Sequence, residues 1–226
     1  MQEIGILERS NLAESVADLL RESIATGSVP SGSRLIEAEI ANQLKVSRGP
    51  VREAFRILET ESLLQSKPGR GVFVTQPSER DIREVYSLRC LLEEEAFRLA
   101  VERRTEADLV NLEKTLEAMF AAAHEGNHAK VLELDLKFHR QTWQIADHHR
   151  LQNMLKELAT QVRMYIAVQT KIYDDLAAGI ADHQILLNAL RDRDADNGTS
   201  TLRKHLELAA DMVTNYFKTH QGKQDN

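Results

Sequence analysis

The chain has 226 residues, of which 42% are hydrophobic and 28% are charged, and its formal net charge is −6 at pH 7. This is the composition of an ordinary soluble protein, and the length can supply a hydrophobic core for two modest domains or one large domain. The single cysteine, Cys90, excludes an internal disulfide framework, and no apolar run reaches the roughly 18 residues of a membrane-spanning helix. Because residues 1–10 also lack the pattern of a signal peptide, we expect a cytoplasmic protein with no membrane partner and with Cys90 in its core.

Apolar spacing and turn residues predict an N-terminal domain over residues 1–76. Its first helix is expected to follow a loose lead-in over 1–10 and to end at Gly27, which is a natural C-cap. A short helix and a longer helix, joined by a tight turn, are expected over 37–44 and 48–62, followed by two short β runs around Lys67 to Gly71. This order of elements is that of a winged helix-turn-helix.

The longer helix of this motif has the charge pattern of a helix that reads DNA. Ser47 stands before it and is expected to cap it, because a serine hydroxyl can accept from the free N–H groups of the first turn. Arg48, Arg52 and Arg56 recur every four residues on one side of the helix. Residues 45–70 hold six basic and three acidic side chains, so this segment is locally positive and suits a phosphate backbone. For the helix alone, a solvated basic face is the alternative interpretation.

The segment VSRGPVREAFRILETESLL, followed by PGRGVFV, resembles the DNA-binding half of the GntR family of transcription regulators. The family usually has threonine where this chain has Gly49, so any contact of that hydroxyl with DNA is not carried over. The resemblance implies a homodimer that places two recognition helices in successive major grooves of a pseudo-palindromic double-stranded operator. The residues expected to contact DNA are Ser47, Arg48, Arg52, Gly69 and Arg70.

Residues 77–226 are expected to form an all-α antiparallel bundle of about six helices, because glycine is rare and proline is absent after Pro77. The chain as a whole is therefore expected to be mainly α. A disordered tail is expected over 222–226. The six helices are expected over about 79–102, 105–125, 128–146, 149–169, 174–192 and 199–219.

Four residues of this bundle could bind a metal ion: Asp135, His139, His183 and His205. Asp135 and His139 are four residues apart and share one helix face, while the two later histidines lie on the apolar sides of two further helices. Three imidazoles and one carboxylate can hold zinc, nickel or manganese and leave coordination positions open. From the spacing alone, ordinary core histidines remain the alternative.

The segments LELDLKFHRQTW, DHQILLNALRDRD and LRKHLELA resemble the FCD ligand-binding domain of the FadR-type branch of the GntR family, in which the aspartate and the three histidines are metal ligands. The resemblance implies a divalent metal, zinc first, and a small organic carboxylate that touches it. The segment YSLRCLLEEEAFRLA matches the same domain and places Arg89 four residues before Glu93. A buried Arg89 would need a carboxylate, either Glu93 or an incoming acid, whereas a surface Arg89–Glu93 pair is the alternative. Arg163 is a second candidate for the effector pocket.

These features predict a DNA-binding transcription regulator, a repressor, whose affinity for its operator is controlled by a small organic acid. A metal-dependent enzyme is the first alternative, but no second carboxylate or nucleophile motif accompanies the candidate ligands. A structural protein whose metal only staples helices is the second. Neither alternative explains the winged helix-turn-helix, so we expect no enzymatic activity.

Overall fold

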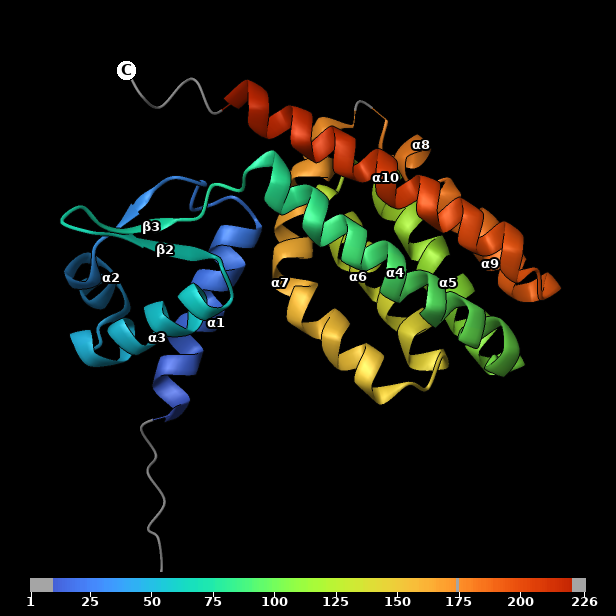
Figure 1. The fold of residues 1–226 in the computed structure, drawn as a ribbon, viewed down its shortest axis with the longest axis horizontal. Helices are drawn as coiled ribbons and strands as arrows, with labels where there is room; N and C mark the ends of the chain where they lie inside the picture. Colours follow the sequence, from blue (N-terminus) through green and yellow to red (C-terminus); the bar gives the residue numbers. More distant parts are fainter. Residues whose placement is uncertain (1–9, 174, 221–226) are drawn as a thin grey trace, which may run out of the picture. The chain divides into compact units, whose positions relative to one another are not determined.

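The computed structural model describes residues 10–173 and 175–220, shown as the coloured ribbon in Figure 1. The chain divides into two compact units, Met1–Gln76 and Pro77–Asn226. Each unit has its own buried core. Among the described residues, no helix combines the length and the hydropathy that crossing a membrane requires.

The N-terminal unit is a winged helix-turn-helix with a three-stranded antiparallel sheet in the order β1-β3-β2. Arg34 of β1 pairs with Phe73, and Lys67 of β2 pairs with Gly71, so β3 is the central strand. Strand β1 was not predicted, because two residues carry no alternation that could reveal it. The elements are α1 (Ser10–Ala25), β1 (Arg34–Leu35), α2 (Glu37–Leu44), α3 (Arg48–Thr60), β2 (Leu64–Lys67) and β3 (Gly71–Val74).

The ends of α1 and α3 are each followed by a residue in the left-handed backbone conformation. Gly27 has φ 73° two residues beyond α1, which confirms it as the C-cap. Helix α3 ends at Thr60 and not at residue 62, because Ser62 has φ 59° and cannot continue a right-handed helix. Of the lead-in expected over residues 1–10, all but Ser10 lies outside the described residues, and Ser10 already belongs to α1.

The described residues of the C-terminal unit form helices and no strand, as predicted, with α4 lying along α10 (Figure 1). Ser78 and Thr105 start the first two helices with capping boxes, in which each side chain accepts from a backbone N–H three residues later. The tail expected over 222–226 lies outside the described residues. The helices are α4 (Glu79–Arg103), α5 (Glu106–His124), α6 (His128–Ile145), α7 (His149–Ile172), α8 (Leu176–Gly179), α9 (Asp182–Asp192) and α10 (Ala195–His220).

Two boundaries in this unit differ from the prediction. The single helix expected over 174–192 is two helices, because Ile180 has ψ 3° and interrupts the helical backbone between them. Helix α10 starts at Ala195, so Gly198 lies inside its first turn and does not break it. A Cβ atom at Gly198 would overlap the buried ring of Phe97. The glycine therefore permits the close approach of α10 to α4, which local sequence rules cannot reveal.

Candidate metal centre and nucleic-acid interface

Four potential metal ligands gather in the interior of the helical unit. Asp135 and His139 come from α6, His183 from α9 and His205 from α10, and all four side chains are buried. One ligand atom from each residue lies within 4.8 Å of the others. The structure thus brings together every residue that the sequence predicted as a ligand, although these residues are up to 70 positions apart in the chain.

Each of the three imidazoles has a hydrogen-bond acceptor close to its Nδ1 atom. The other ring nitrogen, Nε2, is therefore the candidate metal ligand. The Nε2 atoms of His139 and His183 are buried without a hydrogen-bond partner among the described residues, although His183 Nε2 lies 3.2 Å from Asp135 Oδ1. Orphaned nitrogens of this kind fit a metal ion, since buried polar atoms otherwise find partners. The acceptors at Nδ1 are Glu93 Oε2 at 2.7 Å from His139, the Ile180 carbonyl oxygen at 3.1 Å from His183, and Asp182 Oδ2 at 3.5 Å from His205.

The electrostatics of the cluster also suit a cation. Burial alone would raise the pKa of Asp135, but the imidazoles around it, His183 first, outweigh burial and hold this pKa well below its ordinary value. Burial lowers the pKa of His205, although Asp182 opposes this shift. Burial alone would lower the pKa of His139, but Glu93 outweighs burial and raises it. Because metal ligands are ionised carboxylates and neutral imidazoles, a metal would have to displace a proton from a protonated His139.

Arg89 and Glu93 face the interior from α4, each 2% exposed, so the alternative of a surface pair is wrong. Arg89 Nε donates to Glu93 Oε1 over 2.7 Å, and the guanidinium lies 5.3 Å from the centre of the Tyr86 ring. Burial alone would raise the pKa of Glu93, but Arg89 and His139 hold it at about 2. The carboxylate that a buried Arg89 needs is therefore supplied by the chain itself.

Arg163 lies half-buried on α7. Its charge, after those of Lys130 and Lys137, contributes to lowering the pKa of Glu133 on α6. The expected role of Arg163 in binding an effector stays a prediction.

The basic face of α3 is open to solvent, with Arg48, Arg52 and Arg56 all exposed. Ser47 occupies the N-cap position but makes no capping hydrogen bond with its side chain, so the predicted role of its hydroxyl is wrong. Because Ser47 is exposed, water can satisfy the free N–H groups of the first turn. The hydroxyl is left available to other partners.

A contact that the sequence analysis missed joins the two helices of the motif. Arg52 donates from Nε and Nη2 to the two carboxylate oxygens of Glu37 on α2, over 3.0 and 2.9 Å. The Arg52 side chain is still 57% exposed. Fifteen residues separate the pair, so only the folded turn brings them together. Glu37 holds the guanidinium in a defined place on the surface of the motif.

The wing is a tight turn between β2 and β3. Gly69 has φ 71°, a conformation that favours glycine, and Arg70 follows it as an exposed residue at the tip. The Arg70 N–H donates to the Lys67 carbonyl oxygen over 2.9 Å and closes the turn. The tip therefore presents a guanidinium on a short, defined loop.

Comparison with known protein families agrees with this arrangement. Residues 12–74 match the bacterial regulatory proteins of the gntR family, and residues 84–208 match the FCD domain. The chain belongs to the GntR family and carries an FCD domain. The prediction of the family and of its FCD branch is thereby confirmed.

Individual GntR relatives align along most of this chain. The gluconate operon transcriptional repressor of Bacillus subtilis (strain 168) is 27% identical over 220 residues, or 95% of this chain and 90% of that one. The probable D-xylose utilization operon transcriptional repressor of Paenarthrobacter nicotinovorans is 32% identical over 203 residues, or 88% of each chain. The solved structure of E. coli McbR/YncC shares the fold, with a TM-score of 0.78 at 24% identity over 91% of this chain and 98% of that one. The family and the two operon repressors are transcription regulators and not enzymes, as predicted.

Proposed function

We propose that this GntR regulator is a repressor that binds its operator as a homodimer and releases it when a small organic carboxylate binds at a divalent metal in the FCD domain. The observation that carries the proposal is the buried cluster of Asp135, His139, His183 and His205. A sensor needs a site that can accept both the metal and the acid. The name of the gluconate operon repressor supports an acid of this class, since gluconate is itself a carboxylate.

Zinc is the first choice for the metal, because three imidazoles and one carboxylate are among its preferred donors. Nickel or manganese would accept the same residues and expand more readily beyond four ligands, which leaves positions for an effector carboxylate. An acid bound there changes DNA affinity only if it binds two arrangements of the protein with different affinity. Arg163 remains a candidate contact of the acid on the α7 side.

Double-stranded DNA is the proposed partner of the exposed face of α3 and of the wing. Arg48 and Arg52 would reach base edges or phosphates in the major groove, with Ser47 beside them at the start of the helix. Gly69 and Arg70 would bring the wing tip against the backbone or the minor groove. Binding to chromosomal DNA places this activity in the cytoplasm.

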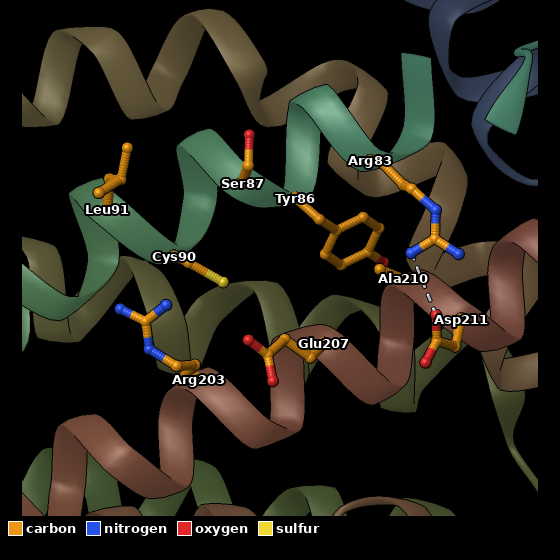
Figure 2. A pocket seen from close by; sticks show the side chains of 9 residues that line it. All are labelled: Arg83, Tyr86, Ser87, Cys90, Leu91, Arg203, Glu207, Ala210 and Asp211. Atoms are coloured by element: carbon orange, nitrogen blue, oxygen red, sulfur yellow. Dashed lines mark hydrogen bonds and ion pairs between the residues drawn. The ribbon is translucent and has the colours of Figure 1, made fainter. Parts of the chain in front are cut away.

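An open pocket between α4 and α10 supports the homodimer (Figure 2). Its volume is about 560 Å³, and its lining carries both signs of charge, with Arg83 and Arg203 beside Glu207 and Asp211. Leu91, on the same face, is 65% exposed. Within one protomer, Arg83 Nη1 lies 3.3 Å from Asp211 Oδ1, and Arg203 Nη2 lies 2.7 Å from Glu94 Oε2. Both arginine side chains are still exposed, so a second copy related by a two-fold axis, which presents the same surface, can add its acidic groups to these pairs. We propose this face as the dimer interface.

Replacing Arg52 by alanine tests the DNA-binding part of the proposal. We expect operator binding to weaken by about 1–3 kcal/mol, roughly 5- to 150-fold, because a base-edge or phosphate contact is lost. If the lost contact is to phosphate, the slope of log affinity against log salt concentration also falls by about one, because one fewer counterion is released on binding. The measurement is a fluorescence anisotropy titration at several salt concentrations. The operator is a DNA duplex that the protein has selected from a random pool, and two protein chains are expected to bind each duplex.

Arg150→Ala is the matched control, since it removes the same charge from an exposed position on α7 of the other unit. Loss of the Arg52–Glu37 pair should barely affect folding, because exposed ion pairs contribute only about 0–1 kcal/mol. If Arg52→Ala binds with the affinity and salt dependence of the wild type, α3 is not the helix that contacts DNA.

A further inference from the structure

Glu93 connects a buried arginine to one of the candidate metal ligands. Its Oε1 accepts from Arg89 Nε over 2.7 Å, and its Oε2 lies 2.7 Å from His139 Nδ1. Arg89, Glu93 and His139 are each at most 3% exposed. The three side chains therefore form a continuous buried chain that starts on α4 and ends at the candidate metal centre on α6.

The direction of these hydrogen bonds fixes the state of the histidine. An ionised carboxylate can only accept, so the proton of a neutral His139 must lie on Nδ1. The lone pair is then on Nε2, which is the buried nitrogen without a partner in the described structure. Only this tautomer can bind a metal through Nε2.

The other two imidazoles do not depend on Glu93. His183 Nδ1 lies 3.1 Å from the backbone carbonyl oxygen of Ile180, and His205 Nδ1 lies 3.5 Å from Asp182. A change at Glu93 therefore acts on the cluster through His139. The Asp182 side chain is 40% exposed, so of these two supporting carboxylates only Glu93, at His139, is buried.

We infer that Glu93 is a positioning residue of the metal centre, which fixes the tautomer and orientation of His139, and that Arg89 acts by holding Glu93. This inference rests on the proposed metal site and deepens it. It gives Arg89 a different task from the effector contact that the sequence suggested, because Arg89 is 2% exposed and its Nε already donates to Glu93.

Glu93→Gln separates positioning from simple packing. A glutamine has one acceptor oxygen where glutamate has two. If that oxygen faces His139, the amide NH₂ meets the Arg89 donor, and if it faces Arg89, the NH₂ donates to His139 and favours the tautomer with its proton on Nε2. We expect Co(II) affinity to fall about 10- to 100-fold, as for other partners of metal-bound histidines. The Co(II) absorption spectrum should also change, because the geometry of one ligand is altered.

A second pair of variants tests the same claim in a background without the buried Arg89–Glu93 ion pair. With Arg89→Met, the donor that competes for the glutamine oxygen is gone, so Glu93→Gln can accept from His139 while Glu93→Leu cannot. We call the double variants Met/Gln (Arg89→Met with Glu93→Gln) and Met/Leu (Arg89→Met with Glu93→Leu). We expect Met/Gln to bind Co(II) about 10-fold more tightly than Met/Leu, and this comparison still applies if Glu93→Gln alone fails to fold. Circular dichroism of the metal-free proteins verifies their folding.

Glu95→Gln is the matched control, since Glu95 is an exposed residue two positions further along α4. It should bind Co(II) as the wild type does. If Glu93→Gln also binds with the affinity and spectrum of the wild type, or if Met/Gln and Met/Leu bind equally, the positioning role is wrong while the metal site stands. If the wild-type protein binds no Co(II) or Zn(II), the inference and the proposed metal site are both wrong.

Discussion

His183→Ala is expected to lower Zn(II) affinity by at least about 100-fold, because losing partners one hydrogen bond away from a metal already costs 10- to 100-fold. His183 is fully buried between Asp135 and the other imidazoles, with Phe138 5.0 Å from its ring centre. No other side chain of the cluster can supply the ligand atom that is lost with His183 Nε2. The measurement is a competition titration against a chromophoric zinc chelator.

The same variant should lose the stabilisation that the metal provides. At free Zn(II) about 100 times the dissociation constant, the wild type gains roughly 2.7 kcal/mol, which corresponds to roughly 5–10 °C in the melting temperature of a 150-residue unit. His183→Ala should show almost none of this gain, whereas His149→Ala, at an exposed position at the start of α7, should show all of it. Equal zinc-dependent shifts in the three proteins would exclude the buried cluster as the metal site.

Gly198→Ala is expected to destabilise the FCD domain by about 1–3 kcal/mol, lowering its melting temperature by roughly 2–12 °C. Alanine is the better helix former and would stabilise an exposed helical site. Here its Cβ would overlap Cε1 and Cζ of Phe97, a ring that is 1% exposed and held by the packing of α4 against α10. The core must therefore shift to admit one methyl group. Differential scanning calorimetry measures the effect.

Gly49→Ala provides the comparison of opposite sign. Gly49 also lies in the first turn of a helix, but nothing lies within 4 Å of a Cβ built there. The same substitution should stabilise the DNA-binding domain by up to about 1 kcal/mol. Phe97→Leu removes the two ring atoms, so Gly198→Ala should cost less in a Phe97→Leu background than in the wild type. A Gly198→Ala protein as stable as the wild type would show that the close approach of α10 to Phe97 does not constrain this position.

The features that the sequence predicted well are those encoded locally. The turn before Arg48, the glycines of the wing and the periodic apolar positions of the long helices depend on residues a few positions apart, and propensity and periodicity describe these directly. The spacing of the histidines and the aspartate, together with the resemblance to the FCD domain, likewise identified a cluster that the fold brings within 4.8 Å. The motifs and the helical periodicity together were enough to predict most of the fold class.

The features that were missed depend on distant parts of the chain. Gly198 reads locally as a helix breaker, and only the presence of Phe97 across the interface explains a glycine inside α10. The spacing of Arg89 and Glu93 revealed that the two side chains could meet, but not that both would be buried. The contact of Glu93 with His139 spans 46 residues, and no pattern along the chain indicates it.

The central claim is that a carboxylate bound at the metal centre controls DNA affinity. The most direct test is the dissociation constant of the zinc-loaded protein for its selected operator, with and without acetate, lactate, citrate and gluconate, in the wild type and in His183→Ala. We predict that at least one acid weakens DNA binding by the wild type about 10-fold or more and leaves the variant unchanged. A change of this size requires the acid to bind the arrangement with low DNA affinity at least about 10-fold more tightly than the other arrangement. The claim is contradicted if every acid leaves the wild type unchanged, or if both proteins respond alike.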